Sequence, residues 1–320
     1  ALETGASNGS YMNKGKQRLS RRAFLAASAA TVAAAPLGLA AATDSARRTG
    51  TIPGSGEQLP AIGMGSWITF DVGDDRGQRE QRVRVLRAFF DAGGGMIDSS
   101  PMYGSSEEVI GFCLRRIANT SSLFSATKVW TPAKWHGVKQ IEDSQAFWGF
   151  KKFDLLQVHN LVAWAPHLET LRELKARGQL RYIGLTTSHG RRHAELAKLM
   201  AEQPIDFVQF TYNILDREAE QRLLPLAVER GLAVIANRPF QRGGLFNRVN
   251  NRPLPDWAGQ FDCANWAQFF LKFIVSHPAV TCAIPATSRF DHMLENMDAG
   301  LGRLPDSKMR QRMIRYIESL

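Results

Sequence analysis

Cysteine is scarce in this chain of 320 residues, with Cys113, Cys263 and Cys282 as its three examples. An odd and sparse set of cysteines provides no disulfide framework, and the spacing matches no zinc-binding motif. We therefore predict that the three thiols pack in the core as small apolar groups, and we predict no metal site.

The chain also lacks a long basic run, although its net charge is +10. Five basic residues fall within residues 1–42, against the single acid Glu3, and they are Lys14, Lys16, Arg18, Arg21 and Arg22. The remaining positive charge is spread along the sequence and could attract anionic ligands or a membrane surface weakly. Because a spread charge does not indicate a nucleic-acid site, we expect no nucleic-acid partner.

The overall composition is that of an ordinary globular protein, with 44% hydrophobic and 22% charged residues. A chain of this length could form two small domains. Single barrel domains of about 250 residues are also common, so length alone leaves both organisations open.

The first forty residues read as a targeting segment. Twin arginines at Arg21 and Arg22 precede a mildly apolar, alanine-rich stretch that ends at Ala42. This arrangement resembles a bacterial twin-arginine export signal, with an A-x-A cleavage site at residues 40–42. We therefore predict a signal region at residues 1–42 (its signal proper at about 12–42), the twin-arginine export machinery as a partner, and a periplasmic or extracellular location. An uncleaved membrane anchor is the alternative, which the weak hydrophobicity and Pro36 disfavour.

From Thr51 onward, short apolar strands alternate with amphipathic helices. The expected core strands are 61–67, 96–98, 123–128, 154–159, 182–186, 207–210, 233–237 and 281–285. The expected helices are 81–92, 107–116, 138–150, 168–177, 191–201, 218–230, 265–276 and 290–299. Eight strand–helix units predict an α/β fold, a (β/α)8 TIM barrel over residues 43–320. A turn at Pro53–Gly56 predicts an N-terminal hairpin, and residues 308–320 predict a C-terminal helix packed outside.

Polar residues stand where several of these strands end. Asp98, Lys128 and His159 each close a predicted strand, and Tyr103 follows Asp98 by five residues. In a parallel barrel such positions converge at one rim, where active sites lie. A tyrosine can protonate a developing alkoxide if a neighbouring ammonium, here Lys128, lowers its pKa. In this interpretation Asp98 orients Lys128, and His159 donates a hydrogen bond to the substrate oxygen.

In these segments the chain resembles the aldo/keto reductase superfamily over roughly residues 51–300. The resemblance depends on Ile97–Gly104, Ala126–Lys128, Leu155–Asn160, Ile183–Thr186, Ile284–Arg289 and Glu295–Asn296. It implies NADPH-dependent reduction of aldehydes or ketones, with Asp98, Tyr103, Lys128 and His159 as the catalytic residues. The expected substrate is a small carbonyl compound, and the expected assembly is a monomer.

The resemblance also implies an NADP(H) site. Its positions in this sequence are Ser66, Trp67, Asn160, Thr186, Thr187, Gln209, Arg238, Phe240, Pro285, Thr287, Arg289, Glu295 and Asn296. Gln209 matches the residue that binds the nicotinamide amide. Arg289 is the cationic candidate for the 2′-phosphate, because the guanidinium fork suits phosphate geometry.

Three positions, after two of the predicted strands, depart from the family pattern. Thr186-Thr187 stands where the family often has Ser-Asn, and Asn237 stands where a tyrosine commonly stacks under the nicotinamide, a surface that Phe240 could replace. The irregular insertion at residues 238–264 is expected to cover the cofactor. An NADP(H)-binding regulatory or accessory protein with the same fold and little turnover is therefore the alternative function.

Aromatic and histidine residues add two further expectations. Trp67, Trp130 and Trp164 are expected on the catalytic rim, where aromatic walls suit hydrophobic carbonyl compounds. Trp257 is expected either there or as a loop anchor. Three histidines without a partner pattern are expected at the surface: His136, His189 and His193.

Overall fold

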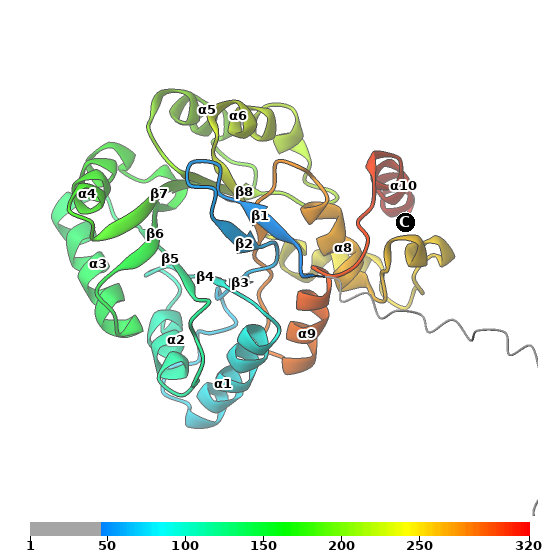
Figure 1. The fold of residues 1–320 in the computed structure, drawn as a ribbon, viewed down its shortest axis with the longest axis horizontal. Coiled ribbons are helices and arrows are strands. Elements are labelled where there is room, and N and C mark those ends of the chain that lie inside the picture. Colours follow the sequence, from blue (N-terminus) through cyan, green and yellow to red (C-terminus); the bar gives the residue numbers. More distant parts are fainter. Residues whose placement is uncertain (1–45) are drawn as a thin grey trace, which may run out of the picture. The chain divides into compact units, whose positions relative to one another are not determined.

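The structure, a computed structural model, describes residues 46–320 (Figure 1). The predicted signal region at residues 1–42 lies outside the described residues. Within residues 46–320, no helix is both long enough and apolar enough to span a membrane.

Eight parallel strands of the described region form the predicted barrel. Their bounds are β3 (Met64–Gly65), β4 (Met96–Asp98), β5 (Phe124–Val129), β6 (Phe153–Val158), β7 (Leu180–Thr186), β8 (Phe207–Thr211), β9 (Ala233–Asn237) and β10 (Cys282–Ala283). The first and last strands close the ring, because the Gly63 amide donates to the Ala283 carbonyl at 2.8 Å and the Gly65 amide donates to the Pro285 carbonyl at 3.0 Å. The barrel predicted from the strand–helix alternation is confirmed.

Helices surround the strands, as Figure 1 shows. Their bounds are α1 (Arg76–Asp91), α2 (Ser106–Leu114), α3 (Lys134–Trp148), α4 (Trp164–Ala176), α5 (His193–Glu202), α6 (Leu223–Arg230), α7 (Gly244–Arg248), α8 (Trp266–Val275), α9 (Phe290–Asp298) and α10 (Ser307–Glu318). Helix α1 begins five residues before the predicted start, because the Asp75 side chain caps it by accepting from the Gln78 amide at 2.9 Å.

The predicted N-terminal hairpin, β1 (Thr49–Thr51) with β2 (Gln58–Pro60), covers one end of the barrel. Its Ile52 and Leu59 are buried in one cluster with Met96 and Phe124, which begin β4 and β5. The hairpin therefore fills the amino end of the barrel with apolar side chains, and the cavity that the barrel offers lies at the carboxyl end.

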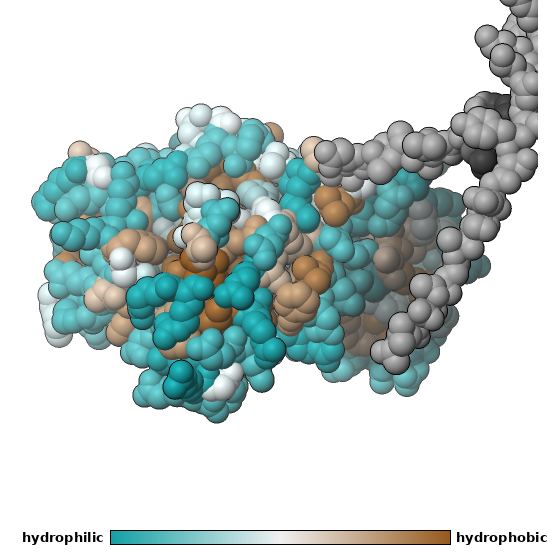
Figure 2. Space-filling model, turned by 60° about the horizontal axis from the view of Figure 1, so that its bottom comes forward, coloured by the Kyte–Doolittle hydropathy of each residue, from teal (hydrophilic) through white to brown (hydrophobic). Residues whose placement is uncertain are grey.

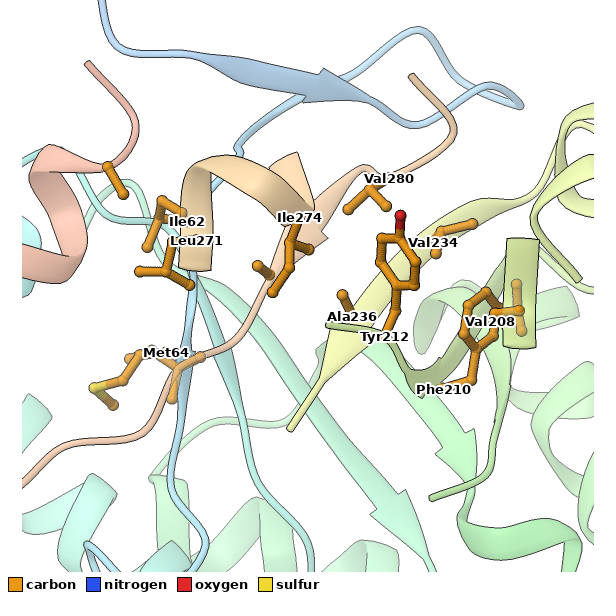
Figure 3. Close-up of a cluster of buried hydrophobic side chains, with 14 of the residues drawn as sticks. Ile62, Met64, Val208, Phe210, Tyr212, Val234, Ala236, Leu271, Ile274 and Val280 are labelled. Carbon is orange, nitrogen blue, oxygen red and sulfur yellow. The ribbon is translucent and has the colours of Figure 1, made fainter. Parts of the chain in front are cut away.

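A larger core lies between the strands and the helices. Figure 3 shows part of it, where Ile274 of α8 lies near Ala236 of β9 and Leu271 of α8 lies near Ile62. The outer surface is mainly hydrophilic on the face in Figure 2, with hydrophobic residues gathered near its centre. All three cysteines are free and buried, and burial raises the pKa of each thiol to about 12. Their predicted role in core packing is confirmed.

The insertion after β9 is less irregular than predicted. It contains the 3-10 turn η3 (Gln241–Gly243), helix α7 and a second 3-10 segment, η4 (Asp256–Phe261). Helix α7 is only five residues long, too short for the periodicity of its apolar residues to indicate a helix.

Candidate active site

The alternation of side chains along each strand builds the site. Met96 of β4 belongs to the apolar barrel interior, and Asp98, two residues later, points to the same side. In β5, Phe124 and Ala126 are in the interior cluster and Lys128 follows in the same alternation. The interior therefore changes from apolar to polar towards the carboxyl ends of the strands.

Asp98 and Lys128 form a buried ion pair. The Lys128 Nζ donates to Asp98 Oδ2 at 2.5 Å and to the Ser99 carbonyl at 2.7 Å. Burial alone would lower the pKa of Lys128, but the carboxylate of Asp98 and the nearby Tyr103 outweigh it, and the pKa of Lys128 is raised. Lys128 is therefore an ammonium at neutral pH.

Two carboxamides complete the surroundings of Asp98. Gln157 Nε2 donates to Asp98 Oδ1 at 3.1 Å, and Gln209 Nε2 donates to the same oxygen at 3.0 Å. Gly184, next to Gln157 in the sheet register, makes room for that side chain, since a Cβ at Gly184 would lie 2.9 Å from Gln157 Cγ. Both oxygens of the carboxylate are thus held from different strands.

His159 follows β6 and is buried and neutral. Its Nδ1 lies 3.0 Å from the Ser100 hydroxyl, and Nε2 has no hydrogen-bond partner among residues 46–320. Burial, followed by the positive charge of Lys128, holds the pKa of His159 well below its usual value of 6.5. The strand predicted to include His159 ends one residue earlier, because the backbone turns into a 3-10 segment, η1 (His159–Leu161), with Asn160 at φ 51°.

Tyr103 lies on the turn after β4, above the ion pair. Its ring centroid is 5.8 Å from the His159 ring at a near-perpendicular angle and 6.4 Å from the Trp67 ring. The Lys128 Nζ is 5.3 Å from the Tyr103 ring centroid. Burial raises the pKa of Tyr103 more than the charge of Lys128 lowers it, so the predicted lowering of this pKa is wrong. The Tyr103 phenol is therefore protonated at neutral pH.

A cavity of about 520 Å³ opens above these residues. Asp98, Tyr103 and His159 line it, and Lys128 lies beneath. The predicted cofactor residues that line the cavity are Ser66, Trp67, Asn160, Thr186, Gln209, Arg238 and Phe240. The structure thus brings this part of the predicted cofactor site together with the four predicted catalytic residues.

Two further predicted residues are buried beside the cavity without lining it. Thr187 follows β7, and its hydroxyl is buried with no hydrogen-bond partner among the described residues. Pro285 follows β10, and its carbonyl joins β10 to β3.

The remaining predicted residues lie outside this cavity, around the start of α9 and along it. Thr287 is buried and its hydroxyl accepts from the Arg289 amide at 3.1 Å. Arg289 is exposed and its guanidinium pairs with Asp291, with Nε to Oδ1 at 3.0 Å. Asn296 is buried and Glu295 is half-buried on the same helix.

The structure adds residues that the sequence did not suggest. His189 and Arg242 line the cavity from loops, and Gln157 supports Asp98. His189 is exposed, as predicted, and it also lies at the rim of the cavity, which the sequence did not indicate. Gln157 could have been found from the alternation that places Leu155 and Gln157 on one side of β6, whereas no local pattern distinguishes His189 or Arg242.

The tryptophans separate into two groups. Trp67 lines the cavity, whereas Trp130 and Trp164 do not. Trp257 packs against Phe269 of α8 and Tyr316 of α10, at 5.8 Å between ring centroids in each case, so it is a loop anchor.

Solved structures share this architecture. An aldo/keto reductase from Klebsiella pneumoniae in complex with NADP and acetate matches with a TM-score of 0.69 and 24% identity, over 84% of this chain and 95% of that one. The holo form of aldo-keto reductase AKR11C1 from Bacillus halodurans matches with a TM-score of 0.70 and 21% identity, over 85% and 96% of the two chains. At these identities the likeness concerns the fold.

Sequence comparison identifies the family as well as the fold. Methylglyoxal reductase YeaE from Escherichia coli (strain K12) is 27% identical over 243 residues, which cover 74% of this chain and 84% of YeaE. The sequence profile of the Aldo/keto reductase family matches residues 61–313, most of the chain. The protein described here therefore belongs to the aldo/keto reductase family of oxidoreductases.

Proposed function

We propose that this protein reduces an aldehyde or ketone to the alcohol with NADPH, and that Tyr103 supplies the proton. The observation that carries the proposal is the position of the Lys128 ammonium, bonded to Asp98 and 5.3 Å from the Tyr103 ring at the base of an accessible cavity. During reduction the carbonyl oxygen develops alkoxide character. A neighbouring acid can protonate this oxygen, and a fixed positive charge stabilises the negative charge that results.

The residues present fit a nicotinamide cofactor. Carboxamide side chains of Asn160, Gln209 and Asn237 line the cavity, and the partnerless hydroxyl of Thr187 is buried beside it. Such groups can satisfy the amide of a nicotinamide ring. In this proposal Ser66, Arg238 and Phe240 hold the same end of the cofactor, and the residues around α9, Thr287, Arg289, Glu295 and Asn296, hold its adenosine end. NADPH, when bound, supplies the hydride to the carbonyl carbon.

The protein's own groups then manage the proton. The carbonyl oxygen gains negative charge during reduction and becomes basic enough to take the proton of Tyr103. The phenolate left behind is stabilised by the Lys128 ammonium, which Asp98 holds in place. His159 is neutral, and with Nδ1 paired to Ser100 its Nε2 is the nitrogen available to bond the substrate oxygen. The alcohol leaves after Tyr103 regains a proton from solvent.

The test is NADPH oxidation with a panel of aldehydes and ketones, with Tyr103→Phe beside the wild type. We expect turnover that falls at least about a hundredfold in the variant, because general acid catalysis contributes on the order of 10²–10⁴. Full turnover by Tyr103→Phe would show that the acid is another group. Tight NADPH binding without turnover over the whole panel would favour the regulatory alternative.

We further propose export through the twin-arginine route. The support is the pair Arg21–Arg22 ahead of an alanine-rich stretch and the A-x-A site at residues 40–42. Substitution of both arginines by lysine should leave the protein in the cytoplasm of a bacterial host, while the unchanged protein reaches the periplasm with a mass that begins after Ala42. Periplasmic recovery of the double variant would contradict the proposal.

A further inference from the structure

The loop after β9 extends over the cavity and places an arginine on an aromatic ring. Arg238 and Arg242 both line the cavity, and the Arg242 Cζ lies 4.4 Å from the centroid of the Trp67 ring. Trp67 comes from the loop after β3 and is itself 6.4 Å from Tyr103. The Trp67 ring therefore contacts the guanidinium of Arg242 and is also a neighbour of the proposed proton donor.

This loop is held in a strained conformation. Arg238, Gln241 and Arg242 have φ values of 53°, 50° and 59°, in the left-handed region that disfavours residues other than glycine. The Asn213 amide donates to the Arg238 carbonyl at 3.1 Å, and Gln241 Nε2 donates to Asp216 Oδ2 at 2.8 Å. Strain of this kind persists where surrounding contacts over-determine the backbone, and it gathers at ligand sites.

The charge that the loop brings to the cavity is not neutralised by the protein. Among residues 46–320, neither Arg238 nor Arg242 forms an ion pair, and the one acid that lines the cavity, Asp98, is paired with Lys128. Arg238 Nη1 is buried without a hydrogen-bond partner among these residues. The charge of Asp216 favours the charged form of Arg238, but the Asp216 carboxylate accepts a hydrogen bond from Gln241 and forms no ion pair with Arg238.

The neighbouring groups reinforce this positive field. His189 lies at the same rim, and burial, followed by the charges of Arg238, Arg191 and Arg242, lowers its pKa. His189 is therefore neutral at neutral pH and adds a hydrogen-bonding group without compensating the arginines. A cavity with an apolar wall and uncompensated cations at its mouth favours anionic ligands.

We propose that Arg242 binds an anionic substituent of the carbonyl substrate, so that the preferred substrates are aldehydes or ketones in which an apolar spacer separates a carboxylate from the carbonyl. The inference rests on the proposed function. Trp67, Ile68 and Met102 line the cavity and provide the apolar wall for the spacer between the two groups. A guanidinium that stacks on a ring still offers its edge to a carboxylate, with two parallel hydrogen bonds. The phosphates of the nucleotide are the other source of the same anionic chemistry.

The kinetic test compares an acid with its neutral ester. The substrates are 4-carboxybenzaldehyde and methyl 4-formylbenzoate, and the quantity is the ratio of their kcat/KM values. We expect Arg242→Gln to lower this ratio about tenfold, a modest change because the pair is partly exposed to solvent. Arg242→Lys should lie between, since it keeps the charge and loses the planar fork. The matched control is Arg252→Gln, which removes the same charge from an exposed position of the same insertion.

Three results would overturn the inference. An unchanged ratio in Arg242→Gln would show that Arg242 does not bind the carboxylate of the substrate. A rise in the Kd of NADPH with an unchanged ratio would assign the guanidinium to the nucleotide phosphates. An equal fall of the ratio in Arg252→Gln would show that the preference for the acid depends on the net charge of the protein and not on Arg242.

A binding measurement separates this inference from the proposed function. Calorimetric titration of the NADP⁺-loaded protein with the acid and the ester needs no turnover. If neither aldehyde is reduced but the acid binds more tightly than the ester in the wild type only, the anion site stands and the reductase proposal fails. If the acid has no preference over the ester in the wild type, the anion site fails whatever the turnover.

Discussion

The Lys128 Nζ lies 2.5 Å from Asp98 Oδ2, and the two side chains are 0% and 3% exposed. Removal of one partner of such a pair leaves an uncompensated buried charge, whereas removal of both does not. Gln157 and Gln209 remain as neutral donors to the other carboxylate oxygen. The stability and the chemistry of the site can therefore be separated by substitution.

Lys128→Met should destabilise the protein by about 3–5 kcal/mol, because the Asp98 carboxylate loses its counter-charge. Lys128→Met/Asp98→Asn should recover much of that loss, while carbonyl reduction stays absent in both variants. Urea unfolding and NADPH oxidation measured on the same samples check this. Activity in the stable double variant would show that the ion pair has a structural role alone.

The stability of the protein should depend on pH through His159. Its pKa in the folded state lies well below the usual 6.5, so the unfolded chain binds this proton first as the pH falls. The contribution of His159 to stability is full above pH 6.5 and decreases below it, by up to about 1.4 kcal/mol per pH unit. Unfolding midpoints between pH 5 and 7 should show a smaller slope in His159→Gln.

The control for this slope is His292→Gln, which removes an exposed histidine from α9. If the slope of the unfolding midpoint against pH decreases equally in His159→Gln and His292→Gln, the pH dependence arises from other groups.

The fold and the base of the site could be predicted because they follow from local periodicity. Alternation within strands places Asp98 and Lys128 on the inner side of the barrel, and strand ends define the rim. Gln157 obeys the same alternation and was missed because a carboxamide alone indicates no chemistry. The net effect on Tyr103 was also beyond the sequence, since it depends on how deeply the ring is buried.

The cavity mouth could not be predicted in the same way. Arg242 and His189 reach it on loops whose backbone has positive φ at non-glycine residues, at 59° and 64°. Such conformations are fixed by distant contacts, among them the hydrogen bond from the His189 amide to the Thr211 hydroxyl at 3.0 Å. Contacts between residues so far apart in the chain cannot be predicted from the spacing of residues in the sequence.

Glu107 gives a prediction that is independent of catalysis. This buried carboxyl of α2 accepts from Thr127 at 2.6 Å, from Ser144 at 2.8 Å and from Trp148 at 3.1 Å. Burial raises its pKa more than these bonds lower it. Since the folded state then holds the proton more tightly than the unfolded chain, this group makes stability fall as the pH rises above about 4.5.

Glu107→Gln should remove that fall, because its amide is neutral and can satisfy the same three partners. Its unfolding midpoint should equal or exceed that of the wild type at pH 7. Glu107→Ala should lose about 2–4 kcal/mol through unpaired donors and a cavity. Urea unfolding at pH 4.5 and pH 7 measures both effects, and a destabilised Glu107→Gln at pH 7 would mean that the ionised carboxylate is the required form.

The preference for NADPH over NADH should depend on Arg289. Its guanidinium is exposed and paired with Asp291, so a nucleotide phosphate would compete with that carboxylate for it. Arg289→Ala should raise the KM for NADPH about tenfold and change the KM for NADH little, since the interaction requires a phosphate. Asp291→Asn should lower the KM for NADPH, because the arginine is released. Arg222→Ala, another exposed arginine, serves as the control, and equal losses with both cofactors in Arg289→Ala would place the 2′-phosphate elsewhere.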